Sequence, residues 1–159
     1  MVSKVFITLV LLCWSTVANA GALLQAEYPY SLEKDNIHQV EGGSTMPLYI
    51  NLTSFDEVKA LQAQIKVTLP KGFAALPNNS WQIDNSLGQQ AVTMWQLPSN
   101  YGQNFDLLYI KPQEQLQSGQ YKIVVEAICE AWQIKQEISF DYVPSDKPMQ
   151  TQKVANVVV

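Results

Sequence analysis

The chain has 159 residues, with ten basic and 14 acidic side chains and a net charge of −4, and every basic residue is a lysine. Nucleic-acid binding rests on clustered lysine and arginine side chains that neutralise phosphates, so this composition argues against a nucleic-acid partner. It also argues against a polybasic membrane patch. The length fits one domain with a sizeable hydrophobic core.

Residues 1–20 have the pattern of a secretory signal. Lys4 precedes an apolar run, and Ala18-Asn19-Ala20 forms an A-x-A cleavage site. The mature chain is expected to begin at Gly21, and the loss of Lys4 brings its net charge to −5. Because no later apolar run approaches the ~18 residues of a membrane span, we expect an exported protein without a transmembrane span. It would be extracellular, at the cell surface or in the periplasm.

The cysteine count predicts a domain without an intramolecular disulfide bond. Cys13 lies inside the signal, so Cys129 is the lone cysteine of the mature chain and no intramolecular disulfide is expected. Lipid attachment at Cys13 stays open as an alternative, although Leu12 is bulkier than the small residue that such signals place before the cysteine.

In the first half of the mature chain, apolar residues recur at every second position, which predicts strands rather than helices. We expect a first strand over residues 23–31 and a connection over 33–43. Two strands follow over 48–53 and 61–69, joined by the polar loop 54–59. The clearest alternation places one set of side chains on a core face: Leu61, Ala63, Ile65, Val67 and Leu69.

The second half predicts a short run at 81–83 and strands over 90–97, 104–110, 121–129 and 132–142, separated by proline, glycine and asparagine clusters. The strand over 104–110 is partly apolar on both faces, which indicates an interior position. We therefore predict an all-β protein, an immunoglobulin-like antiparallel β-sandwich of about seven to eight strands. The expected organisation is a signal peptide (1–20), the sandwich domain (21–144) and a tail or linker (145–159).

Two turn motifs carry a family resemblance. Leu69-Pro70-Lys71-Gly72-Phe73 ends one strand, and Gly119-Gln120-Tyr121 begins another. In this order they resemble landmarks of the prokaryotic immunoglobulin-like modules that are attached to alpha-galactosidases and found in surface-layer-type proteins. The resemblance covers residues 46–127 and implies the fold, with structural roles for Pro70, Gly72, Gly119 and Tyr121.

Tyr121 stands at the start of a late strand. That position suits a tyrosine corner, in which the hydroxyl bonds back to a nearby backbone group and fixes the crossover. The alternative is that Tyr121 is only an aromatic residue at the edge of the sheet.

The parts of a catalytic site are scarce. His38 and Cys129 would have to form any Cys-His pair, yet His38 lies in a polar connection and Cys129 lies on an apolar strand face, where a lone cysteine is usually a small core residue. A His/Cys metal site lacks ligands for the same reason. Calcium at Asp56-Glu57 stays open, while nothing in the spacing of the carboxylates selects a glycosidase pair. We predict no enzyme activity, no catalytic residue, no metal and no cofactor.

The aromatic residues suggest a binding role. Trp95 alternates with Thr93 and Leu97 on a core face, whereas Trp81 and Tyr101 follow or lie within polar loops and are expected to be exposed. Exposed rings of this kind can stack on sugars, so a carbohydrate-binding accessory module that uses Trp81 and Tyr101 is the alternative function.

The leading hypothesis is a secreted or periplasmic non-enzymatic module that acts in cell-surface structure, adhesion or protein–protein assembly. A protein partner is expected at an unpaired sheet edge, because edge strands accept an added strand. The tail is a candidate partner strand for a neighbour, through Lys153, Val154, Val157, Val158 and Val159.

Overall fold

The computed structural model describes side chains in six parts of the chain: residues 21–27, 45–55, 60–84, 88–99, 102–113 and 116–144. It describes the backbone alone for residues 16–19, 32–34 and 37–41. All regular secondary structure in these residues is β-strand, which confirms the predicted all-β class.

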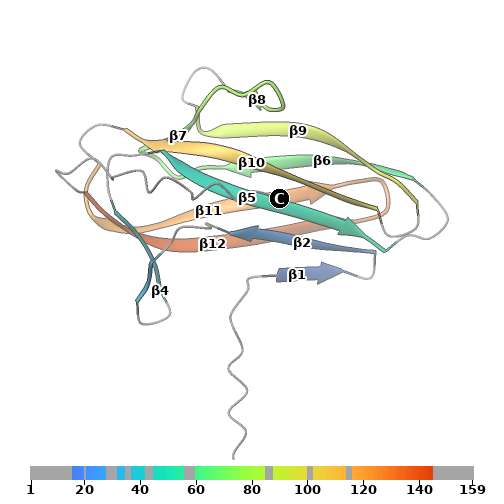
Figure 1. Ribbon diagram of the computed structural model, residues 1–159, viewed down its shortest axis with the longest axis horizontal. Helices are drawn as coiled ribbons and strands as arrows, with labels where there is room; N and C mark the ends of the chain where they lie inside the picture. The colour runs from blue at the N-terminus through green and yellow to red at the C-terminus, as the bar shows by residue number, and fades with distance from the viewer. Residues whose placement is uncertain are drawn as a thin grey trace, which may run out of the picture.

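Two sheets stack face to face as a sandwich (Figure 1). In spatial order, sheet A consists of β1 (Thr16–Asn19), β2 (Ala22–Glu27), β5 (Met46–Ser54), β10 (Gln103–Pro112) and β7 (Phe73–Ala75). Sheet B consists of β3 (Leu32–Lys34), β4 (Ile37–Glu41), β12 (Gln133–Val143), β11 (Gly119–Ile128), β6 (Leu61–Thr68), β9 (Gln90–Leu97) and β8 (Gln82–Ile83). Strands β1 and β8 lie on opposite sides of the molecule in Figure 1.

The predicted sandwich is confirmed, with more strands than expected. Eight of the described strands have five residues or more, and one of these, β4, lies where a connection was predicted: β2, β4, β5, β6, β9, β10, β11 and β12. The remaining four are only two to four residues long: β1, β3, β7 and β8. Strand β10 lies between β5 and β7, but β7 pairs only with its last three residues, Ile110 to Pro112, so the predicted interior position holds at that end alone.

The predicted connection over 33–43 is wrong, because β3 and β4 form there. Strand β4 pairs in parallel with β12, with His38 opposite Phe140, so the sandwich is not wholly antiparallel. This segment has few apolar residues and no clean alternation. Backbone pairing with β12 gives it a partner that its own side-chain pattern does not reveal, which is a common way for tertiary context to override local preference.

The core lies between the sheets, where the alternating apolar faces meet. The predicted core face of β6 is buried, from Leu61 to Val67, and so is Trp95 on β9. Burial of this area is the main stabilising term of such a domain. The alternate positions of β12 from Ile134 to Tyr142 are also buried, and they include one polar residue, Gln136, which is 1% exposed.

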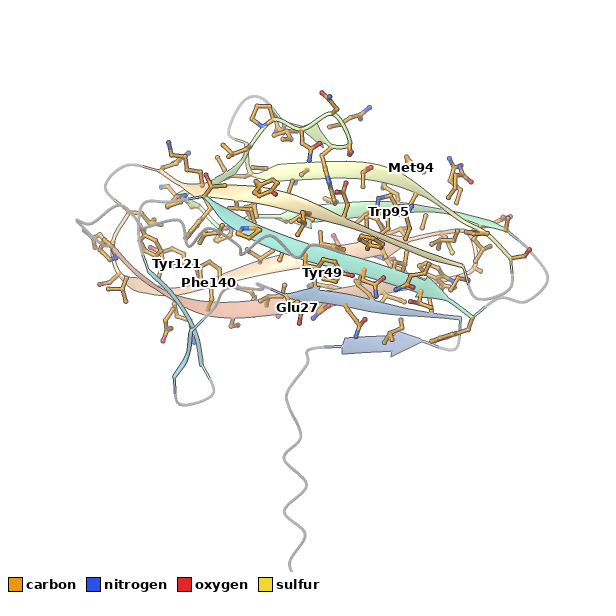
Figure 2. The ribbon with its side chains drawn as sticks, viewed as in Figure 1. Glu27, Tyr49, Met94, Trp95, Tyr121 and Phe140 are labelled. Carbon is orange, nitrogen blue, oxygen red and sulfur yellow. The ribbon has the colours of Figure 1, made fainter. Side chains whose placement is uncertain are left out.

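Phe73 is at the centre of an aromatic cluster at one end of the core. Its ring is fully buried and lies 5.0 Å from Tyr121, 5.4 Å from Phe140 and 5.6 Å from Tyr142, in edge-on arrangements. Figure 2 shows Tyr121 and Phe140 side by side. Gly72, which precedes Phe73 in the turn, has a φ of 94°, a left-handed conformation that favours glycine. The turn is closed by the Phe73 N–H, which donates to the Pro70 carbonyl at 3.1 Å.

Candidate functional site

Trp81 is buried, so its predicted exposure is wrong. The side chain is 4% exposed and packs against Trp95, with ring centroids 6.4 Å apart. Its indole N–H donates to the Asp106 carboxylate on β10 at 3.1 Å, which satisfies the one polar atom of the ring inside the protein. A buried indole of this kind presents no open ring face for a sugar.

The other residues considered for binding or catalysis do not form a site in the described part of the structure. Tyr101, the tail residues Lys153 to Val159 and the Asp56-Glu57 loop lie outside the described residues, as does the side chain of His38. Cys129 is half-buried against the core, and its sulfur accepts a hydrogen bond from the Ala131 N–H at 3.4 Å.

The outer face of sheet B is charged. Lys122 and Lys135 both pair with Glu137, at 2.7 Å and 3.0 Å, and their hydrogen bonds hold the pKa of the Glu137 carboxyl below its usual value. In the strand register, Glu126 lies opposite both Lys135 and Lys66. This face is a solvated surface of alternating charge, which is the ordinary outer face of a sandwich.

The outer face of sheet A is different, because apolar rings occupy it. Phe105 is 63% exposed and Tyr109 is 43% exposed on β10, while Leu107 between them and Tyr49 on β5 are half-buried. The Tyr49 and Phe105 rings lie 6.1 Å apart. We refer to Tyr49, Phe105, Leu107 and Tyr109 as the aromatic face. Figure 2 shows Tyr49 near the centre of this sheet, with Glu27 beside it.

Three amide side chains run across the same face beside the rings. The Asn51 amide donates to the Gln25 side-chain oxygen at 2.9 Å, and the Gln103 amide donates to the Asn51 oxygen at 2.9 Å. We refer to these three residues, on β2, β5 and β10, as the amide ladder. Asn51 is 6% exposed at its centre, so the ladder is a fixed array rather than a set of free side chains. Asn51 lies opposite Phe105 in the register.

This arrangement suits binding rather than bond-breaking chemistry. Solvent-exposed aromatic rings grouped on one face are typical of protein interfaces and of ligand surfaces, because they bury much apolar area with little loss of side-chain freedom. The amide ladder adds hydrogen-bonding groups without charge. Among the described residues, no group of three or more histidine, cysteine, aspartate or glutamate side chains is placed to hold a metal ion.

Sequence reasoning missed the aromatic face although its signal was present. The alternation of Phe105, Leu107 and Tyr109 with Leu108 and Ile110 shows two apolar faces on one strand. Leu108 and Ile110 are fully buried, so only one of these faces is in the core. The second apolar face of this strand is at the surface.

The comparisons with known proteins bear on the fold. No protein-family model matches the chain, and neither does a curated protein. Among solved structures, it is similar to BcpA, the major pilin subunit of Bacillus cereus, with a TM-score of 0.52 and 10% sequence identity. The match covers 78% of this chain and 40% of the pilin subunit, so the chain spans less than half of that protein.

Two further solved structures match with lower TM-scores. The bacterial hydrophobin BslA gives 0.44 at 14% identity, over 80% of this chain and 97% of BslA. A type I cohesin–dockerin complex from Clostridium thermocellum gives 0.43 at 9% identity, over 66% of this chain and 94% of the matched chain. At these identities the likeness to the pilin subunit supports the β-sandwich fold alone. The narrower resemblance to modules of alpha-galactosidases and surface-layer proteins stays a prediction.

In the described part of the chain, no helix is long and apolar enough to cross a bilayer.

Proposed function

We propose that this chain is an exported, non-enzymatic module that binds a protein partner in a cell-surface assembly through the aromatic face. The observation that supports this most directly is the exposure of Phe105, at 63%, with the Tyr49 ring 6.1 Å away and the exposed Tyr109 on the same face of sheet A. Aromatic side chains dominate the binding energy of many protein interfaces. The charged outer face of sheet B offers no comparable surface, which is why we assign the contact to sheet A.

Binding to cell envelopes tests the proposal. Purified protein is mixed with envelopes from the cells that produce it, and the fraction that sediments with them is measured. Phe105→Lys is expected to reduce this fraction strongly, because it places a charge in the centre of the contact. Met94→Lys is the matched control: Met94 is 51% exposed on β9, on the outer face of sheet B, and its substitution should leave sedimentation unchanged. Equal sedimentation of the Phe105 and Met94 variants would contradict the proposal.

Carbohydrate binding by the same face is the second candidate. The amide ladder favours it, because fixed, uncharged amides next to aromatic rings match the hydroxyl groups and apolar ring faces of a neutral sugar. This version moves the sugar site from Trp81 and Tyr101 to Gln25, Asn51 and Phe105.

Protease treatment of the envelopes separates the two candidates. If the partner is a protein, digestion of the envelopes before mixing should abolish sedimentation. If the ligand is a glycan, sedimentation should survive digestion and fall in Gln103→Ala, which removes one end of the amide ladder. Tyr101→Ala tests the original assignment of the sugar site, and unchanged binding in that variant would remove it.

A further inference from the structure

The outermost strand of sheet A comes from the predicted signal. Strand β1 pairs antiparallel with β2, with Asn19 opposite Ala22 and Val17 opposite Leu24. No described strand lies beyond β1 in this sheet. Because β1 lies wholly within residues 1–20, cleavage after Ala20 would remove it and leave β2 as the edge strand.

Strand β2 packs against β12 of sheet B. The side-chain amide of Gln136 on β12 donates to the Ala26 carbonyl at 3.2 Å. At the other end of β2, a Cβ built on Gly21 would lie 2.7 Å from the Trp132 ring. The core side of β2 is covered, with Ala22 and Leu24 fully buried. Without β1, the backbone groups of β2 along this strip would be open to pairing, as they are on any edge strand.

Two buried polar atoms lie beside this strip without a hydrogen-bond partner among the described residues. They are the indole nitrogen of Trp132 and the side-chain oxygen of Gln136, on residues that are 8% and 1% exposed. One is a donor and the other an acceptor. Buried polar atoms are usually satisfied, and these two lack a partner although β1 is in place.

Three of the four residues of β1 recur near the end of the given sequence. Residues 17–19 of β1 are Val-Ala-Asn, and residues 154–156 are again Val-Ala-Asn. Three further valines follow, and β-branched residues favour extended structure. Placed in the register of β1, Val154 would lie opposite Leu24 and Asn156 opposite Ala22.

The direction of β12 and the length of the segment after it allow the same chain to supply this strand. Gly21 lies beside Trp132 and Ala26 beside Gln136, so β2 and β12 run the same way. A chain that turns after Val143 therefore returns antiparallel to β2, as β1 does. To reach the level of Leu24, the chain after Val143 has to run back along β12 for roughly 30 Å, at about 3.4 Å per residue of strand. The segment from Val143 to Val154 spans up to about 36 Å when extended.

We infer that, in the processed protein, Val154 to Asn156 of the same chain replace β1 on the edge of β2. This inference rests on the proposed removal of residues 1–20, and it concerns a sheet edge rather than the aromatic face. Within one chain the high effective concentration of the tail favours its own β2 over that of a neighbour.

Disulfide trapping tests the inference. The full-length protein is produced in cells that export it. The intact mass of the purified protein then establishes whether it begins at Gly21. Leu23→Cys and Ala155→Cys are combined in a Cys129→Ser background, since Ala155 would take the position opposite Leu23 that Ala18 holds in β1. Paired Cα atoms in antiparallel strands are about 4.5–5.5 Å apart, which permits a disulfide. Mild oxidation should cause near-complete loss of free thiol and yield a disulfide-bonded monomer.

Thr53→Cys with Ala155→Cys is the matched control. Thr53 lies opposite Leu23 on the inner neighbour β5, so a tail paired with the edge of β2 should not reach it. Four outcomes would overturn the inference: no disulfide with Leu23→Cys, equal trapping by the control, a disulfide-linked dimer, or a mass that retains residues 1–20. The dimer would assign the strand to a second copy. Each single-cysteine variant is checked for native fluorescence. None of these outcomes depends on Phe105, so the proposed binding face is tested separately.

Discussion

The Tyr121 hydroxyl donates a hydrogen bond to the backbone carbonyl of Gln117, four residues earlier in the chain, at 2.9 Å. This is the bond that a tyrosine corner makes, and it connects the start of β11 to the segment that leads into it. The same ring packs against Phe73 and Phe140 in the aromatic cluster. One side chain thus joins a crossover to the core.

Tyr121→Phe isolates the hydrogen bond from the packing. The variant keeps the ring in the cluster and loses the hydroxyl, so we expect the free energy of unfolding to fall by about 1 kcal/mol. Urea denaturation followed by fluorescence measures this change. Tyr109→Phe removes a hydroxyl from an exposed ring and should change stability much less. Equal losses in the two variants would show that the Gln117 bond adds nothing.

Gly72 is predicted to resist substitution. An alanine there would need a left-handed backbone, with φ near 94°, and its Cβ would overlap the Leu116 side chain. We expect Gly72→Ala to cost about 1–3 kcal/mol of unfolding free energy, measured by urea denaturation. Gly119→Ala is the control, because the nearest heavy atom to a Cβ there is in the Tyr121 ring at 3.8 Å, an ordinary contact. A Gly72 variant as stable as the Gly119 variant would contradict the prediction.

Alkaline pH should weaken the aromatic cluster through Tyr142. Burial, followed by the nearby Tyr121 phenol, raises the pKa of the Tyr142 phenol above its usual value of 10.0. The folded state therefore favours the neutral phenol. The stability that this provides is complete below pH 10 and is lost as the pH rises through the folded pKa. Tyr142→Phe, which cannot ionise at this position, should move the alkaline unfolding midpoint to higher pH, whereas Tyr109→Phe should not.

Two substitutions of similar size at Gln136 are expected to change the free energy of unfolding by very different amounts. Gln136→Met removes the hydrogen bond to Ala26 and also the unpartnered oxygen, so the free energy of unfolding should change by no more than about 1 kcal/mol. Gln136→Glu buries a carboxylate and should cost about 3 kcal/mol or more at pH 7. Because burial raises the pKa of a carboxyl, acidification should restore part of that loss. A Glu variant that is as stable as the Met variant at pH 7 would be contrary to this expectation.

The strands were predictable wherever one face is apolar and the other polar. Leu61 to Val67 and Trp95 fulfil that condition and lie in the core as expected. Strands β3 and β4 do not fulfil it, because their place is set by pairing with β12, a partner that no local pattern identifies.

The candidate site was less predictable than the fold. A tryptophan after a polar turn, such as Trp81, looks exposed in sequence, and its burial depends on Trp95 and Asp106, which lie on other strands. The aromatic face and the amide ladder depend on the order β2, β5, β10, in which strands distant in sequence become neighbours. A single-strand pattern contains no information about that order.

The parallel pairing of β4 with β12 also constrains the order of folding. Strand β4 lies near the start of the chain, yet its partner is the last described strand. Closing so long a loop is slow and becomes favourable only once the distant residues are available. Sheet B therefore cannot be completed until nearly the whole polypeptide has been made. Until β12 has been made, β3 and β4 can pair only with each other, while β2, β5 and β10 of sheet A do not depend on it.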